Sequence, residues 1–306
     1  MVFKRSNTTP LINERGIRGK WNIYIKKYLG DASGAPSSLI PRSIVGISNA
    51  GTKQIKELFN NQAVFNNPKP TNYLSYLLSM GTESEDIVLD FFAGSCSTAH
   101  TVMQMNAEDS GMRRFILVQL PEPTEQGTTA YKQGFATIVD IGTERIRRAG
   151  KKIREENPDY EGDLGFKVFK LDSSNIRAWN PDASDLEQTL YDHVEHLVPG
   201  RSEEDVLYEL LLKRGVDLAT PIESRTVAGK SVYSIGYGVL IACLAPSIAR
   251  GEVEELASGI ISWHEELQPA ADTHIFFRDS AFGDDVTKTN LAAILQQHGI
   301  HHVRSL

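Results

Sequence analysis

A carboxylate followed by a turn of small residues is the part of this chain best suited to chemistry. Asp90 ends the apolar run of residues 87–89, and Gly94 and Ser95 follow it within five positions. The apolar run predicts a buried parallel strand, and the small residues let the backbone turn tightly and approach a ligand at the N-terminus of the next helix. This order predicts a loop that holds a nucleotide-like cofactor, with Asp90 facing a cationic group of the ligand.

The sequence of residues 87–100 resembles the cofactor loop of S-adenosylmethionine-dependent DNA methyltransferases, in particular that of the methylation (Mod) subunit of type III restriction-modification systems. A lone glycine turn is a weak signal, but three further regions carry the same resemblance. These are residues 65–78, residues 113–122 and, as one region, the carboxy-terminal segments 164–172 and 277–282. Together they extend the likeness over nearly all of residues 40–306.

The resemblance implies the carboxy-terminal half of a site-specific DNA adenine-N6 methyltransferase of the permuted amino-methyltransferase (beta) class. It implies an α/β fold, in which a partial Rossmann-like methyltransferase sheet is followed by a second carboxy-terminal α/β domain. We therefore expect a basic remnant of the target-recognition region and a linker at 1–60, the cofactor-binding part at 61–160 and an α/β assembly domain at 161–306.

The cofactor implied by the resemblance is S-adenosylmethionine. Asp90, Phe92, Gly94 and Ser95 would hold its methionine and ribose end. Gln119 would meet the ribose hydroxyls, with Glu122 as the alternative, and Lys69 and Pro70 would line the pocket wall. The full set of cofactor-binding residues implied in this way is Lys69, Pro70, Asp90, Phe91, Phe92, Ala93, Gly94, Ser95, Ser97, Thr98 and Gln119.

One motif of the family is missing from this sequence. Amino-methylating members need an Asp or Asn followed by Pro-Pro and an aromatic residue, and the nearest string, Asn157-Pro158-Asp159-Tyr160, lacks the second proline. We interpret it as a surface turn. The motif accepts hydrogens from a poorly nucleophilic adenine amine and stacks on the extruded base. We therefore expect no catalytic residues here and little activity from this chain alone.

Cys96 is a second departure, because the family's loop normally has glycine at this position. If the backbone there adopts a positive φ, or presses against the methionine carboxylate, a cysteine would strain the turn or occupy ligand space. Cofactor affinity depends on which of these applies.

Composition sets wider limits on function. The chain has 306 residues, 41% of them hydrophobic, a net charge of −7 and two cysteines, Cys96 and Cys243, without metal-ligand spacing. No apolar run approaches the ~20 residues that span a bilayer, so we expect a cytoplasmic protein without a membrane partner. Residues 1–60 hold ten Lys or Arg against three Asp or Glu. This basic segment is either a remnant of a DNA-contacting region or a solvated tail.

Hydrophobic periodicity predicts the elements that position these residues. We expect strands at 87–90, 115–120, 166–171, 231–235, 239–244 and 274–278, and helices at 52–59, 71–80, 97–105, 131–153, 186–197, 203–213 and 291–297. The basic end of the 131–153 helix, which includes Arg145, is interpreted mainly as a complement to the negative helix terminus, with a DNA-binding face as the alternative.

Two other functions remain open beside the methyltransferase. One is a non-catalytic assembly or binding module that has lost cofactor binding. The other, a small-molecule oxidoreductase, is disfavoured because the second loop glycine and an acid at the next strand end are absent. The implied partners are DNA, through the complete enzyme, and the restriction subunit. The strand that ends at Asp90 needs its edge covered, which points to a homodimer or to a missing amino-terminal methyltransferase half.

Overall fold

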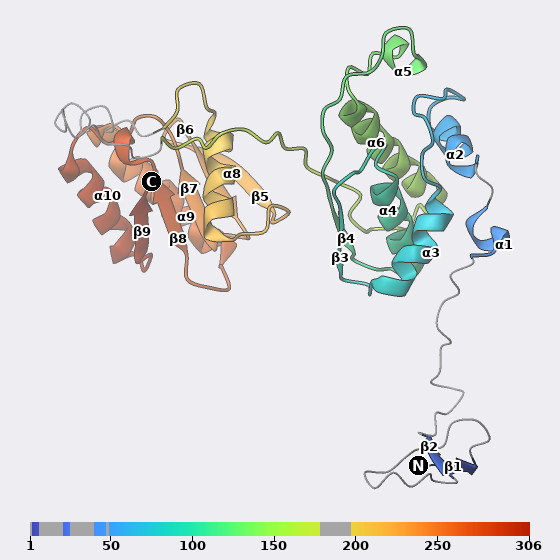
Figure 1. Cartoon of the computed structure of the whole chain (residues 1–306). Helices are drawn as coiled ribbons and strands as arrows, with labels where there is room; N and C mark the ends of the chain where they lie inside the picture. The colour runs from blue at the N-terminus through green and yellow to red at the C-terminus, as the bar shows by residue number, and fades with distance from the viewer. Residues whose placement is uncertain (1, 6–20, 25–39, 47–48, 178–196) are drawn as a thin grey trace, which may run out of the picture. The chain divides into compact units, whose positions relative to one another are not determined.

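The computed structural model describes residues 2–5, 21–24, 40–46, 49–177 and 197–306 (Figure 1). The described chain is of the α/β class and divides into two compact units, unit 1 at Met1–Gly165 and unit 2 at Phe166–Leu306. About half of the basic amino-terminal segment, chiefly residues 6–20 and 25–39, and all but the last residue of the predicted 186–197 helix lie outside the described residues.

The sheet of unit 1 that leads to the predicted site has two parallel strands, β3 (Ile87–Asp90) and β4 (Arg114–Leu117). Their register pairs Val88 with Phe115 and Leu89 with Ile116. A separate antiparallel pair is formed by β1 (Val2–Arg5) and β2 (Trp21–Tyr24). The expected β3 is confirmed, while β4 ends three residues before the predicted boundary.

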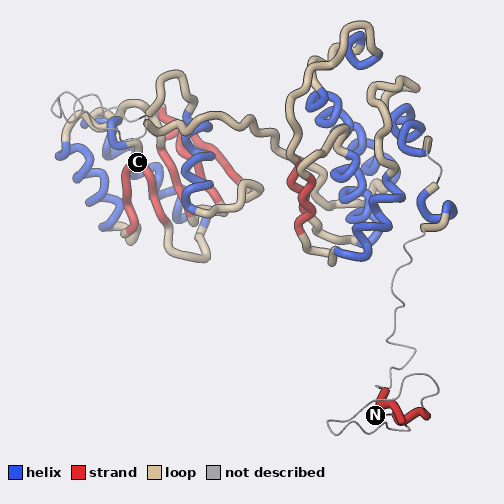
Figure 2. The backbone as a smooth tube through the Cα atoms, viewed as in Figure 1, coloured by secondary structure: helices blue, strands red, loops and turns tan. Residues whose placement is uncertain are grey.

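The helices of unit 1 lie on one side of β3 and β4, as Figure 2 shows. They are α1 (Arg42–Val45), α2 (Ala50–Leu58), α3 (Thr71–Gly81), α4 (Ser97–Asp109), α5 (Thr129–Lys132) and α6 (Ile138–Glu156). Helix α4 packs against both α3 and α6. Ile55 and Leu58 of α2 share a buried core with Ile141 of α6. This packing holds α4 and the loop before it in place.

The predicted helix at 131–153 is wrong in its first turns. The chain instead forms the short α5 and starts a new helix, α6, at Ile138. Gly134 has a φ of +84°, which ends α5. Thr137 then begins α6 with a capping box, in which its hydroxyl accepts the N–H of Asp140 and the Asp140 carboxylate accepts the N–H of Thr137.

Unit 2 is built on a five-stranded sheet in the order β5-β6-β7-β8-β9. The strands are β5 (Ile222–Val227), β6 (Lys230–Ile235), β7 (Leu240–Cys243), β8 (His274–Phe277) and β9 (His302–Ser305). Strand β6 pairs antiparallel with both β5 and β7, and β8 pairs parallel with both β7 and β9.

Helices cover both faces of this sheet. Successive residues of a strand point to opposite faces of a sheet, so β7 contributes to the core on both sides. Leu240 and Ala242 pack with α8 (Glu203–Arg214) on one face. Ile241 and Cys243 pack with α9 (Val253–Leu267) and α10 (Asp285–Gln297) on the other. Two short 3₁₀ turns, η2 (Arg250–Glu252) and η3 (Asp279–Ala281), complete the described elements.

Several predictions for unit 2 need correction. Residues 166–171 form no strand, although their apolar alternation predicted one. Strands β5 and β9 and helix α9 were not predicted, and α10 begins six residues earlier than expected. The predicted β6, β7, β8 and α8 are present. In unit 1, residues 157–160 form an exposed turn, as expected, in which Tyr160 N–H donates to the carbonyl of Asn157 at 3.0 Å.

Candidate functional site

The loop between β3 and α4 is held at both ends by Asp90. One carboxylate oxygen accepts the N–H of Phe92 at 3.0 Å, and the other accepts the hydroxyl of Thr98 at 2.6 Å. Thr98 lies in the first turn of α4, so a single side chain joins the end of the strand to the start of the helix. The predicted residues Asp90 and Thr98 therefore lie together, and Asp90 is half-buried.

The end of β4 is also bonded to this loop. The Oε1 atom of Gln119 accepts the N–H of Gly94 at 2.7 Å, and Ala93 N–H donates to the carbonyl of Val118 at 3.2 Å. Gln119 was predicted to meet the ribose of the cofactor. The structure places it against the loop, which agrees with a position beside the predicted site, while its role toward a ribose stays a prediction. Glu122 is exposed.

The loop reaches α4 through two residues in the left-handed region. Gly94 has a φ of +52° and Cys96, the N-cap of α4, has a φ of +56°. No side chain caps the helix, and its first turn contains no acidic residue. The first N–H groups of a helix have no partners within it, and the helix dipole adds positive potential there. This terminus can therefore bind an anionic group of a ligand.

The side chain of Cys96 lies against α6. A Cβ placed on Gly142 of α6 would come 2.5 Å from the Cys96 Sγ atom, so the absence of a side chain at Gly142 makes room for the sulfur. The thiol is buried, and this burial raises its pKa to about 11. Of the two consequences expected from Cys96, the strained positive φ is present, and the sulfur packs against Gly142.

Arg145 of α6 lies under the loop with its side chain fully buried, at 0% exposure. Its Nη1 atom donates to the hydroxyl of Ser95 at 2.8 Å and to that of Ser97 at 2.5 Å. Burial lowers its pKa to about 10. The sequence interpretation placed Arg145 in a basic cluster that complements the negative helix terminus, but its guanidinium is directed at Ser95 and Ser97 of the loop instead. The helical period could have corrected it, because Ile141 and Ala149 lie one turn on either side.

His100 follows the loop residues in α4 and is also buried. Burial, together with the nearby charges of Arg145 and Lys152, lowers the pKa of its imidazole to about 3. Its ring is therefore neutral at physiological pH.

The segment before α3 approaches the same loop through an aromatic residue. A Cβ on Gly94 would lie 3.4 Å from the Cζ atom of Phe65. Pro70 is the N-cap of α3, and Lys69 is exposed. The amide of Gln54 bonds to Thr71 at 2.9 Å and fixes this segment to α2. The pocket-wall role of Lys69 and Pro70 stays a prediction.

Beside the loop, unit 1 exposes large apolar side chains. Phe91 and Phe92, both predicted cofactor residues, are 62% and 91% exposed. On the face of β3 and β4 opposite the helices, Leu89 is 50% and Ile116 is 51% exposed. Apolar residues at the centre of a strand normally pack against a second layer. This face is therefore an incomplete core within the described part of unit 1.

Comparison with known families identifies the part of the chain that contains the loop. Residues 18–149 match the family model described as DNA methylase. This part of the chain belongs to the DNA methylase family. The match ends within α6, so it includes the loop between β3 and α4, the exposed face of β3 and β4, and Arg145.

Curated relatives specify the kind of DNA methylase. The StyLTI Mod subunit of Salmonella typhimurium, from a type III restriction-modification enzyme, is 44% identical over 127 residues, which are 42% of this chain and 19% of the relative. The EcoP15I Mod subunit of Escherichia coli is 36% identical over 209 residues, 68% of this chain and 30% of the relative. The EcoPI Mod subunit of Escherichia phage P1 is 30% identical over 190 residues, 61% of this chain and 28% of the relative.

The chain is thus related to type III Mod subunits, which confirms the resemblance seen in its motifs. The matched regions span between about a fifth and a third of the length of these relatives.

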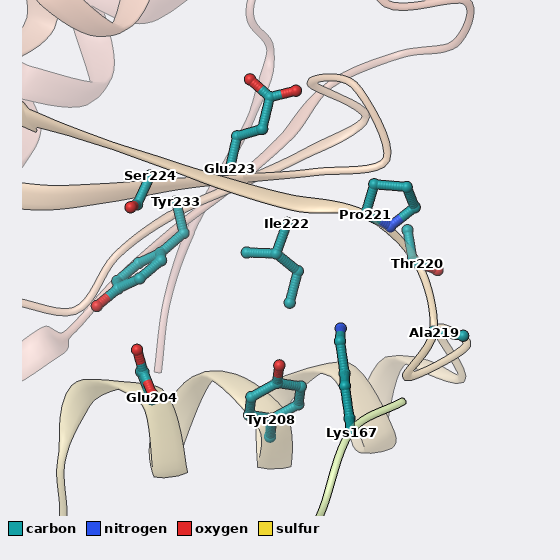
Figure 3. A pocket seen from close by; sticks show the side chains of 10 residues that line it. All are labelled: Lys167, Glu204, Tyr208, Ala219, Thr220, Pro221, Ile222, Glu223, Ser224 and Tyr233. Atoms are coloured by element: carbon teal, nitrogen blue, oxygen red, sulfur yellow. The ribbon is translucent and has the colours of Figure 1, made fainter. Parts of the chain in front are cut away.

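Unit 2 contains a separate cavity of about 310 Å³ between α8 and β5 (Figure 3). Lys167 extends into the space between Tyr208 and Ile222, while Glu223 points away from it. The Lys167 ammonium donates to the carbonyl of Leu218 at 2.8 Å, so its charge already has a partner. The described residues contain no cluster of three metal-ligating side chains, and none of their helices could cross a membrane.

Proposed function

We propose that unit 1 is the S-adenosylmethionine-binding part of a site-specific DNA adenine-N6 methyltransferase of a restriction-modification system. The observation that carries the proposal is the β3–α4 loop, in which Asp90 and the uncapped N-terminus of α4 lie at the end of a parallel strand. Together these groups complement a ligand that carries both an ammonium and a carboxylate, as the methionine end of S-adenosylmethionine does. The partial Rossmann-like character of the sheet belongs to this proposal.

The chain's own residues fit this cofactor. Asp90 would attract the ammonium, the first N–H groups of α4 at Ser97 and Thr98 would bind the carboxylate, and Gln119 would face the ribose. Lys69 and Pro70 would form the wall, with Phe91, Phe92, Ala93, Gly94 and Ser95 completing the set. When bound, S-adenosylmethionine supplies an electrophilic methyl group on a sulfonium. The contribution of these residues is to bind and orient it.

We propose further that another methyltransferase segment covers the exposed face of β3 and β4 and brings the catalytic tetrapeptide that this sequence lacks. Leu89 and Ile116 are half exposed at the centre of their strands, and burying their apolar surface against another segment would stabilise the complex. DNA would be bound by the complete enzyme, with unit 2 contacting a restriction subunit. The chain alone is then expected to bind the cofactor and to transfer its methyl group poorly or not at all.

Calorimetric titration of the full chain with S-adenosylmethionine tests the proposal. Binding by the unmodified chain, weakened at least tenfold by Asp90→Asn, is the expected result, because this change removes the charge and keeps the shape. Asp86→Asn is the matched control, since Asp86 lies just before the other end of β3 and its carboxylate accepts the nearby N–H of Glu83 at 2.8 Å in a turn. An absence of binding by the unmodified chain would overturn the cofactor role.

A second candidate function, a non-catalytic assembly module, is favoured by β5. This strand forms an edge of the unit 2 sheet and pairs with β6 along all six residues without a bulge. Bulges, proline and charged residues normally protect such an edge from pairing with another chain, and of these β5 has only the oppositely charged Glu223 and Arg225. An antiparallel pair of two β5 strands centred on Ser224 would place Glu223 opposite Arg225 of a second copy, which adds a cross-strand acid to the pair that Arg225 makes with Glu266 of its own chain at 2.6 Å. This geometry supports a homodimer.

Sedimentation of Ser224→Lys tests this assembly. Two lysines would face each other at the centre of the pair and should shift the chain toward the monomer. A mixture of Ser224→Lys with Ser224→Glu should restore the dimer through opposite charges. If the unmodified chain is a monomer, or if both variants dimerise as well as it does, β5 is not the assembly surface.

A further inference from the structure

The guanidinium of Arg145 is buried without a carboxylate partner in the described part of the chain. No ion pair joins it to a carboxylate, and it is the second largest fully buried side chain described. Removing a cation from water without a paired anion costs several kcal/mol. Its half-buried neighbour Arg148 bonds to Glu144 at 2.7 Å, so α6 does supply an acid where it pairs another arginine. Arg145 therefore calls for a different explanation.

Its hydrogen bonds are directed at the loop. Nη1 reaches the hydroxyls of Ser95 and Ser97, while Nε and Nη2 are buried without a hydrogen-bond partner among the described residues. Ser95 precedes the left-handed Cys96, and Ser97 is the first residue of α4. Arg145 thus fixes the residues on both sides of the N-cap. Its charge adds to the positive end of the helix dipole at the same place.

We propose that Arg145 is a positioning residue for the cofactor loop, and that its charge selects the carboxylate of the ligand's methionine end. The inference rests on the proposed function of unit 1. Through Ser95 and Ser97, Arg145 holds the first N–H groups of α4 in the orientation that receives an anion. A buried cation interacts with such an anion more strongly than an exposed one, because water screens it less.

Comparing the affinities for two ligands distinguishes this role from a purely structural one. S-adenosylhomocysteine carries the carboxylate, whereas decarboxylated S-adenosylhomocysteine keeps the ammonium and lacks it. Arg145→Gln and Arg145→Met remove the charge, and Arg145→Lys keeps it. Replacement of a buried charge by an apolar side chain is often neutral or stabilising, so Arg145→Met keeps the test available if Arg145→Gln does not fold. Arg147→Met is the control on the exposed face of α6, where Arg147 is 62% exposed.

The expected result is a loss of at least tenfold in affinity for S-adenosylhomocysteine in both neutral variants, with less than threefold change for the decarboxylated ligand. Arg145→Lys should recover most of the difference, and Arg147→Met should bind as the unmodified chain does. Equal losses for the two ligands, or no loss for either, would overturn the inference and leave the proposed function standing. If the unmodified chain binds neither ligand, the proposed function fails and the inference fails with it.

Discussion

Gly142 is the residue on which the packing of the loop depends most directly. A Cβ at this position would come 2.5 Å from the Cys96 Sγ atom and 3.3 Å from the carbonyl oxygen of Gly94. We expect Gly142→Ala to lower the free energy of unfolding of unit 1 by about 1–3 kcal/mol through overpacking. Urea unfolding, monitored through the hydrogen exchange of the α4 amides, measures this change.

Removal of the sulfur should rescue that variant. In Cys96→Ala the Cβ–Cβ contact would be an ordinary 3.5 Å, so the double variant should recover most of the lost stability. Gly81→Ala is the control, because no atom lies within 4 Å of a Cβ there. Additive effects of the Gly142 and Cys96 changes would show that the two residues are not in contact.

His100 makes unit 1 sensitive to acid. Its folded pKa is about 3 against an ordinary 6.5, so below pH 6.5 the unfolded chain binds a proton that the folded chain does not. The free energy of unfolding therefore falls as the pH decreases from 6.5 toward 3, by up to about 1.4 kcal/mol per pH unit. His100→Leu should reduce this loss between pH 7 and 5, measured by exchange of the α4 amides. The exposed His301→Gln should not, and an unchanged slope in His100→Leu would contradict the account.

At the scale of elements, the N-terminus of α6 positions both Gly142 and Arg145. The capping box joins Thr137 and Asp140, with the N–H of Thr137 donating to the Asp140 carboxylate at 2.8 Å. Thr137→Ala should cost about 1 kcal/mol and speed exchange in the first turn of α6, while Thr137→Ser should keep the cap. Identical exchange in Thr137→Ala and the unmodified chain would show that tertiary packing alone fixes this end.

The elements around the loop could be predicted because local sequence determines them. Pro70 precedes α3, and the apolar run before Asp90 forms β3. Strand β5 could not be found from an alternation of apolar and polar residues, because it lies at the edge of the sheet and its four central residues are exposed. Residues 166–171 show the reverse, since their alternation predicts a strand and the structure forms none there. Pairing depends on distant segments, which a local pattern does not contain.

The candidate site was predictable to a similar extent. The positions of Asp90, Gly94 and Thr98 follow from the strand, turn and helix order, and the structure brings them together. Arg145 was missed because five other basic residues lie near it in the sequence and all six were interpreted together as a complement to the negative helix terminus. Burial depends on which face of α6 packs against α4, and that requires the tertiary contact.

At the scale of the whole molecule, the open face of unit 1 should affect association more than stability. Leu89→Thr and Ile116→Thr change half-exposed side chains, so each should alter the free energy of unfolding by no more than about 0.5 kcal/mol. Val88→Thr, on the buried face of the same strand, should cost about 1–3 kcal/mol. Equal costs for Val88→Thr and Leu89→Thr, measured by urea unfolding, would mean that both faces are already covered.

Hydrogen exchange of the full chain, with and without saturating S-adenosylhomocysteine, tests the central claim most directly because it locates the ligand. The account predicts slower exchange in the peptides that contain residues 90–99 and Gln119, with little change in β5 to β9 of unit 2. Protection confined to the cavity between α8 and β5, or no protection anywhere at a saturating concentration, would contradict it.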